Sequence, residues 1–181
     1  MKRRYLSMVT AALAATLAMQ GCSRGPDPAK VQADIAKAQA DGQKTIADAQ
    51  ANMDKVIAQN NKDLVDARVD ARLANANAAG ANGENSPASS DNPSSAVPPA
   101  SQAVAQTRMQ ANDRTADAQY ELDKAKGEAA YNVALARCEA QTAAALDACK
   151  EAAKARYDAD MVSAKNRNDA AHKANQAPSN G

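Results

Sequence analysis

The chain has 181 residues, 22 basic and 21 acidic side chains, and a formal net charge of +1. It contains no Trp and no Phe, and alanine supplies most of its apolar content. Burying a large apolar side chain contributes about 1.5–3 kcal/mol, which alanine does not match, so we expect extended helices in place of a compact globule. The sequence has no basic, aromatic-rich segment, which argues against nucleic acid as a partner.

The N-terminal residues have the pattern of an export signal. Lys2, Arg3 and Arg4 precede an apolar run of about 15 residues, whereas a membrane-spanning helix needs about 20. The run extends from Tyr5 to Met19 and is followed by Gln20-Gly21-Cys22. A basic start, an apolar stretch and a small residue before Cys resemble the signal peptide and lipobox of bacterial lipoproteins. This resemblance implies that residues 1–21 are removed and that Cys22 carries acyl chains, palmitate among them.

Ser23 follows the cysteine, where Asp would favour retention in the inner membrane. This resembles the sorting pattern of outer-membrane lipoproteins, and it implies a chain anchored to that membrane and facing the periplasm. Residues 22–27 are then a lipidated tether. The alternative is ordinary signal cleavage after Ala18, which would release a soluble periplasmic protein.

A long helix is expected over residues 28–79. Asp27 is a favourable N-cap and Pro28 suits the first helical position. An 11-residue repeat follows, interrupted by Gly42 and lost at Arg68, and its period of about 3.67 residues per turn predicts a nearly straight or slightly right-handed helix. The large side chains at this period form one helix-packing stripe, made of Val31, Ile35, Ile46, Met53, Ile57 and Leu64.

Residues 80–100 change to Gly, Ser, Asn and Pro, which predicts a disordered linker. A second helix is expected over 101–174, with the same 11-residue period and only Gly127 as an interruption, followed by a disordered tail over 175–181. Its packing stripe contains Tyr131, Leu135, Leu146 and Tyr157. The predicted fold class is therefore all-α, with two long Ala-rich amphipathic helices joined by a linker.

Once Cys22 is set aside, Cys138 and Cys149 remain as a pair that an oxidising periplasm would favour as a disulfide. In one continuous helix they would stand about 16 Å apart, and a disulfide needs Cα atoms within about 7 Å. The segment between them has no Gly or Pro, which favours a continuous helix and a bridge between two chains. A bond within the chain would require a tight helical hairpin.

A family resemblance favours the hairpin. Ala130-Tyr131-Asn132-Val133-Ala134, Cys138-Glu139 and Cys149 resemble a segment of small exported proteobacterial proteins that are sometimes labelled TolA-like. Those proteins often carry Gly midway between the cysteines, where this chain has Ala143-Ala144. The resemblance implies no activity.

No catalytic constellation is apparent. The carboxylates of the first helix lack a pocket that would shift their pKa values, and His172 is expected to be a solvated residue near the C-terminus. Zinc would need four close ligands, so we expect no metal, no cofactor and no small-molecule substrate. The sequence predicts a non-catalytic, lipid-anchored structural or interaction protein of the cell envelope. Its partners would be the membrane and either a second copy or another helical protein; the alternative is an amphipathic lipid-associating or stress-protective protein.

Overall fold

The computed structural model describes residues 25–81 and 99–176, and all regular structure in these ranges is helical. Helix α1 spans Pro28–Ala81, α2 spans Pro99–Cys138 and α3 spans Ala143–Gln176. The predicted all-α fold is confirmed. The signal peptide, Cys22, and nearly all of the linker predicted over 80–100 lie outside the described residues, as does the end of the predicted tail.

The start of α1 follows from its capping residues. The backbone N–H of Ala29 donates to the Asp27 carboxylate at 2.9 Å, and the N–H of Val31 donates to the Asp27 carbonyl at 3.0 Å. Asp27 is therefore the N-cap and Pro28 occupies the first helical position, where its missing N–H has no cost.

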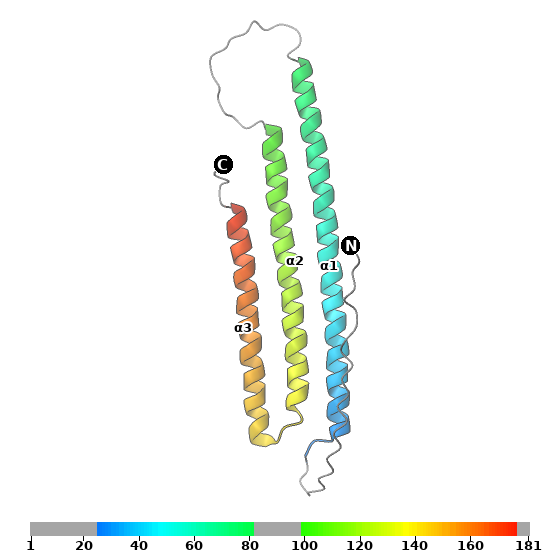
Figure 1. Cartoon of the computed structure of the whole chain (residues 1–181), viewed down its shortest axis with the longest axis vertical. Helices are drawn as coiled ribbons and strands as arrows, with labels where there is room; N and C mark the ends of the chain where they lie inside the picture. The colour runs from blue at the N-terminus through cyan, green and yellow to red at the C-terminus, as the bar shows by residue number, and fades with distance from the viewer. Residues whose placement is uncertain (1–24, 82–98, 177–181) are drawn as a thin grey trace, which may run out of the picture.

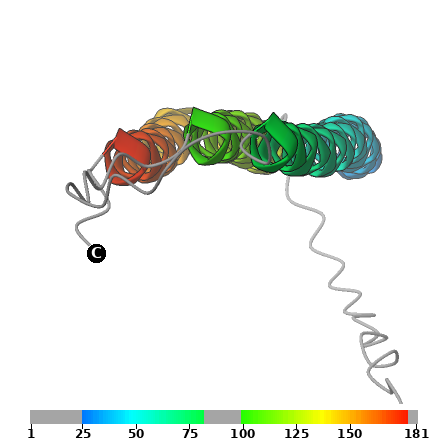
Figure 2. The same cartoon turned by 90° about the horizontal axis from the view of Figure 1, so that it is seen from above.

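The three helices form a single layer. They run up, down and up in Figure 1, and the view along their axes in Figure 2 shows them side by side in a gently curved row with α2 in the middle. α2 packs against both neighbours, whereas α1 and α3 do not meet within the described residues. A layer one helix thick leaves the two broad faces of α2 uncovered, which limits how much surface the fold can bury.

Alanine dominates the small buried core. The side chains of Ala111, Ala118 and Ala129 are no more than 9% exposed, and Leu122 is the only large side chain of α2 buried to that extent. Small side chains let the helix axes approach closely. The helices are therefore held together by contact along their length and not by a few large buried side chains. The other buried apolar residues are Val31, Ala125, Cys138 and Ala164.

The packing stripe predicted on the first helix lies on the side of α1 that meets α2. Val31 is buried, and Ile35, Ile46, Met53, Ile57 and Leu64 are half-buried. They share a helix face with Gly42 and Asn60, which contact α2 directly. The stripe is therefore used within the chain and does not form a free association surface.

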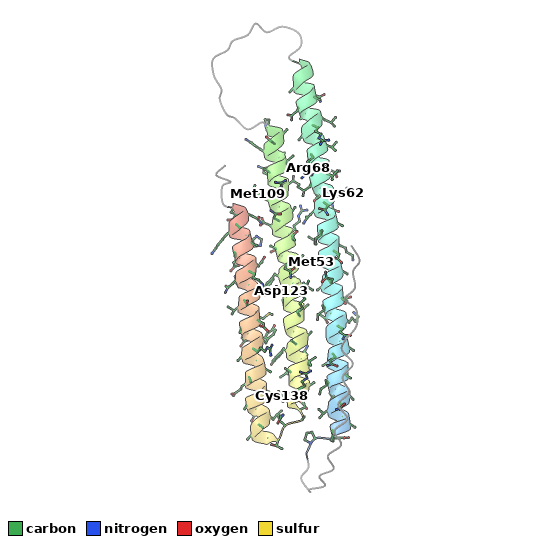
Figure 3. All side chains as sticks on the ribbon, in the orientation of Figure 1. Met53, Lys62, Arg68, Met109, Asp123 and Cys138 are labelled. Carbon is green, nitrogen blue, oxygen red and sulfur yellow. A yellow bond between two sulfur atoms is a disulfide. The ribbon has the colours of Figure 1, made fainter. Side chains whose placement is uncertain are left out.

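The prediction of one continuous helix over 101–174 is wrong. α2 ends at Cys138, residues 139–142 turn the chain, and α3 begins at Ala143. In Figure 3, Cys138 lies at this turn beside the start of α3. Folding back covers the apolar side of α2 with α3, which a continuous helix would leave in water.

Candidate functional site

One broad face of the layer carries a groove of about 610 Å³ that all three helices line. Its floor comes from α2, where Gly127, Ala130 and Ala134 present little or no side chain. Tyr131 of α2 and Tyr157 of α3 close one side of it, with ring centroids 5.1 Å apart and planes inclined by 29°. The groove exists because small residues on α2 leave space that larger side chains of α1 and α3 border.

The charges around this groove are mostly positive. Lys126, Arg137 and Arg156 line it, and Asp160 is the single carboxylate among the lining residues. Arg137 and Arg156 are exposed. An apolar floor with a basic rim can accept an apolar group that carries a neighbouring negative charge.

A disulfide closes the turn between α2 and α3. The Cα atoms of Cys138 and Cys149 are 5.6 Å apart, and Cys138 is 1% exposed. The N–H of Gln141 donates to the Cys138 carbonyl at 2.8 Å, and the N–H of Leu146 donates to the Thr142 carbonyl at 2.8 Å. Thr142 therefore occupies the N-cap position of α3, a common role for Thr. Of the two alternatives that the sequence left open, the structure has the bond within the chain.

At the opposite end of α3, a polar cluster joins it to α2. His172 lies between two aspartates one turn apart on α2, with Nδ1 2.9 Å from Asp113 and Nε2 2.8 Å from Asp117. Asn175 donates to the same Asp113 oxygen at 2.8 Å. His172 is half-buried and partnered, so the expectation of a solvated residue is wrong.

The two aspartates change the acid–base behaviour of His172. Hydrogen bonds to Asp117 and Asp113 raise the pKa of His172 above its ordinary value of 6.5, although partial burial opposes this. The same contact with His172 lowers the pKa of Asp117. The imidazolium form can donate from both nitrogens at once, which the neutral ring cannot do.

A second polar cluster lies in the seam between α1 and α2. Asn60 is 4% exposed, and its Nδ2 donates to the Ala111 carbonyl at 2.7 Å and to the Thr115 hydroxyl at 3.0 Å. Arg114 pairs with Asp63 at 2.7 Å and lowers the pKa of that carboxyl. Asn60 is a polar residue at a packing position of the 11-residue repeat, so at this level hydrogen bonds take the place of apolar contacts between α1 and α2.

The remaining predicted positions are distributed along the layer. Tyr131, Leu135, Leu146 and Tyr157 are all half-buried, but only the two tyrosines line the groove. No group of three or more His, Cys, Asp or Glu side chains within 25–81 and 99–176 is arranged to hold a metal ion. Among the described helices, none is long and apolar enough to cross a bilayer.

Sequence reasoning missed several of these contacts. Thr142 is a potential N-cap in the sequence, and this signal could have located the turn between the cysteines. The pairing of His172 with Asp113 and Asp117 had no such signal, because it depends on the hairpin. Comparison with protein-family models, curated proteins and solved structures finds no match for this chain.

Proposed function

We propose that this protein is a non-catalytic structural and interaction element of the bacterial cell envelope, anchored by lipid at Cys22 and projecting into the periplasm as a flat helical rod. The lipobox-like sequence supports the anchor. Its Ser23 supports sorting to the outer membrane, with soluble periplasmic release as the alternative.

The observation that carries the proposal is the position of α1 relative to Cys22. Only residues 23–27 separate Cys22 from the first turn of α1. The first turn of α1 lies at the same end of the layer as the turn between α2 and α3 (Figure 1), which the Cys138–Cys149 disulfide closes. An anchored chain would therefore hold the disulfide end near the membrane. At about 1.5 Å per residue, the 54 residues of α1 reach roughly 80 Å from it.

The open layer is compatible with a scaffold. Its charged side chains on α1 are largely paired along the helix surface, as with Lys37 and Asp41 at 2.7 Å and Lys44 and Asp48 at 2.8 Å. All three helices line its groove. Rigid helices with exposed broad faces offer area for other macromolecules, which is how a spacer or docking element acts.

The amphipathic lipid-associating alternative has less support. It requires a broad apolar face that can lie in a membrane interface. Ile35, Ile46 and Ile57 are half-buried on the side of α1 that meets α2, so releasing them for lipid would cost the α1–α2 packing.

The anchor can be tested by producing the full-length chain in a Gram-negative host with an alkyne analogue of palmitate. The wild type should incorporate the label and sediment with outer membranes, and Cys22→Ser should do neither. Cys138→Ser with Cys149→Ser is the matched control and should remain labelled. Label that persists in Cys22→Ser, or an unlabelled wild type in the soluble periplasmic fraction, would overturn the anchored form.

A further inference from the structure

Three of the five large apolar side chains that are exposed in the described residues lie on one line of α1; the other two are Met109 of α2 and Val162 of α3. Val65, Val69 and Leu73 are 55%, 49% and 58% exposed. They follow one another at intervals of four residues, so they form a continuous stripe along two turns of the helix. We call Val65, Val69 and Leu73 the outer stripe.

The outer stripe points away from the rest of the layer. Asn60 marks the side of α1 that meets α2. At about 100° per residue, Val69 lies about half a turn around the helix from Asn60, and Val65 and Leu73 lie to either side of Val69. Half-buried Ala67 and Ala71 occupy the inner side at this level. Beyond Leu64, the last half-buried member of the packing stripe, the larger apolar side chains have therefore moved from the seam to the outer edge.

This part of α1 belongs to a thinner tip of the molecule. Asn175, in the last turn of α3, hydrogen bonds to Asn112 at 3.2 Å, and Asn60 of α1 bonds to the neighbouring Ala111. Above this level the described structure has only α1 and α2, as Figure 1 shows; Lys62 and Arg68 mark the segment in Figure 3. The exposed large apolar side chains of α1, Val65, Val69 and Leu73, all lie in this tip.

We propose that the outer stripe pairs with the outer stripe of a second copy of this chain, with the two α1 helices parallel. Charge placement argues for this occupant. Asp66 and Arg72 stand three residues before and after Val69, about 60° to opposite sides of the stripe. The stripe therefore has an acidic border and a basic border, and Asp66 on the acidic border also pairs with Lys62, one turn earlier on α1, at 3.7 Å.

The borders also select the parallel orientation. A two-fold axis along the helices places the acidic border of one copy beside the basic border of the other, so that Asp66 faces Arg72. A two-fold axis across the helices makes an antiparallel pair and places Asp66 beside Asp66. Asp70 lies further out on the acidic border and Arg68 further out on the basic border, so both add to the preference for parallel helices.

The pairing is confined to the tip. Below it, the outer edge of α1 carries Lys37 and Lys44, which are exposed and held by Asp41 and Asp48. These positions offer no apolar contact to a second copy. Three half-exposed side chains per chain fall short of the roughly 1,200 Å² that a stable interface buries, so the pair is weak in dilute solution. Anchoring of both copies at one membrane raises their effective concentration toward the millimolar range and favours the pair. Only this effect of the anchor rests on the proposed function.

Cysteine crosslinking of the full chain tests the pairing. Val65→Cys, Val69→Cys and Leu73→Cys are each produced in bacterial cells and oxidised mildly, and dimers are quantified on non-reducing gels. Val162→Cys on α3 is the matched control, because this valine is 60% exposed but lies off the stripe. All three stripe positions should form dimers, and Val162→Cys should form several-fold less. Equal dimer yields at Val162 and the stripe, or no dimers at the stripe, would overturn the proposal.

The pattern of crosslinks reports orientation. Parallel helices link Val65→Cys to itself and Leu73→Cys to itself, whereas antiparallel helices link these two variants only when they are mixed. Repeating the measurement with purified Cys22→Ser protein at rising concentration separates this inference from the anchor. Self-links at positions 65 and 73 in that protein support the pairing even if Cys22 proves to carry no lipid. Mixed links alone contradict the parallel pair.

Charge reversal supplies a second measurement. In the Val69→Cys background, Asp66→Arg places two arginines together at the interface and should lower the dimer yield about fivefold. Adding Arg72→Asp restores opposite charges and should restore the yield. If the double reversal stays as low as the single one, the borders do not face each other as proposed.

Discussion

Gly42 of α1 lies directly against Ala129 of α2. A Cβ built on Gly42 would stand 2.8 Å from the Cβ of Ala129 and 3.3 Å from its Cα. The 11-residue repeat places Gly42 among Val31, Met53 and Leu64, all larger. The glycine that interrupts the stripe is therefore a position where the backbone of α1 lies close to the backbone of α2.

Gly42→Ala should therefore destabilise the protein although Ala favours helix by about 1 kcal/mol. The new methyl meets an atom fixed to the backbone, and overpacking of this kind costs about 1–3 kcal/mol. Gly127→Ala is the matched control, because its Cβ would meet the flexible end of Met161 and that side chain can move. Urea unfolding followed by circular dichroism should shift down for Gly42→Ala and up or not at all for Gly127→Ala. Shifts of both variants in the same direction would contradict this account of the seam.

The disulfide should stabilise the hairpin of α2 and α3. It closes a loop with a sequence separation of 11, for which the loss of unfolded-state entropy is worth about 2–3 kcal/mol. Cys138→Ser with Cys149→Ser, and reduction of the wild type, should lower the stability by similar amounts in denaturant titrations. An unchanged unfolding midpoint after reduction, or bridged dimers of the wild type on a non-reducing gel, would contradict the bond within the chain.

His172 should make the stability depend on pH. Its pKa is raised in the folded chain, so its contribution is fully present below the unfolded value of 6.5 and is lost as the pH rises through the raised pKa. The lowered pKa of Asp117 means that its contribution is present above 3.8 and is lost as the pH falls through the lowered value. The cluster is therefore strongest between these limits.

His172→Gln should lower the melting temperature more at about pH 5.5 than at about pH 9. Asn175→Ala is the control, because Asn175 also bonds Asp113 but does not titrate, so its effect should be similar at both values. A His172→Gln effect of the same size at both pH values would show that the ionised pair adds nothing.

Asn60 should fix the register of α1 against α2. Asn60→Ala removes two hydrogen bonds to α2, each worth about 0.5–1.5 kcal/mol, while the Ala111 carbonyl keeps the Thr115 hydroxyl as a donor at 2.8 Å. Asn60→Leu should keep the helix content but allow α1 to slide by one 11-residue repeat, since a buried polar group is what distinguishes the registers. Spin labels on α1 and α2 would then give two distances. Asn61→Leu is the control, because Asn61 is exposed, and it should give a single distance between the two labels. A single distance in Asn60→Leu as well would mean that other contacts fix the register.

The helical class and the first helix were predictable because they depend on local signals. Asp27, Pro28 and the 11-residue period determine where α1 begins and which side packs. The sequence also indicates the pair Cys138 and Cys149. These features need only neighbouring residues and the period of a helix.

The hairpin was not predictable in the same way. Residues 139–142 have no Gly or Pro, so local propensity favours helix, and the turn is stabilised by contacts far apart in sequence such as Tyr131 with Tyr157. The roles of His172 and Asn60 follow from that arrangement, because their partners come close only after α2 has packed. The core residues were also not predictable, because nothing in the sequence distinguishes the buried Ala118, Ala125 and Ala164 from the many exposed alanines.

The anchor and the intact hairpin can be measured together by intact mass spectrometry of the protein purified from membranes without reductant. We expect a chain that begins at Cys22, carries the mass of its acyl chains, and is lighter by about two hydrogens than the fully reduced form, as a disulfide within one chain requires. An unmodified chain that begins at another residue would contradict the lipid anchor. A lipidated monomer with two free thiols would contradict the disulfide-closed rod.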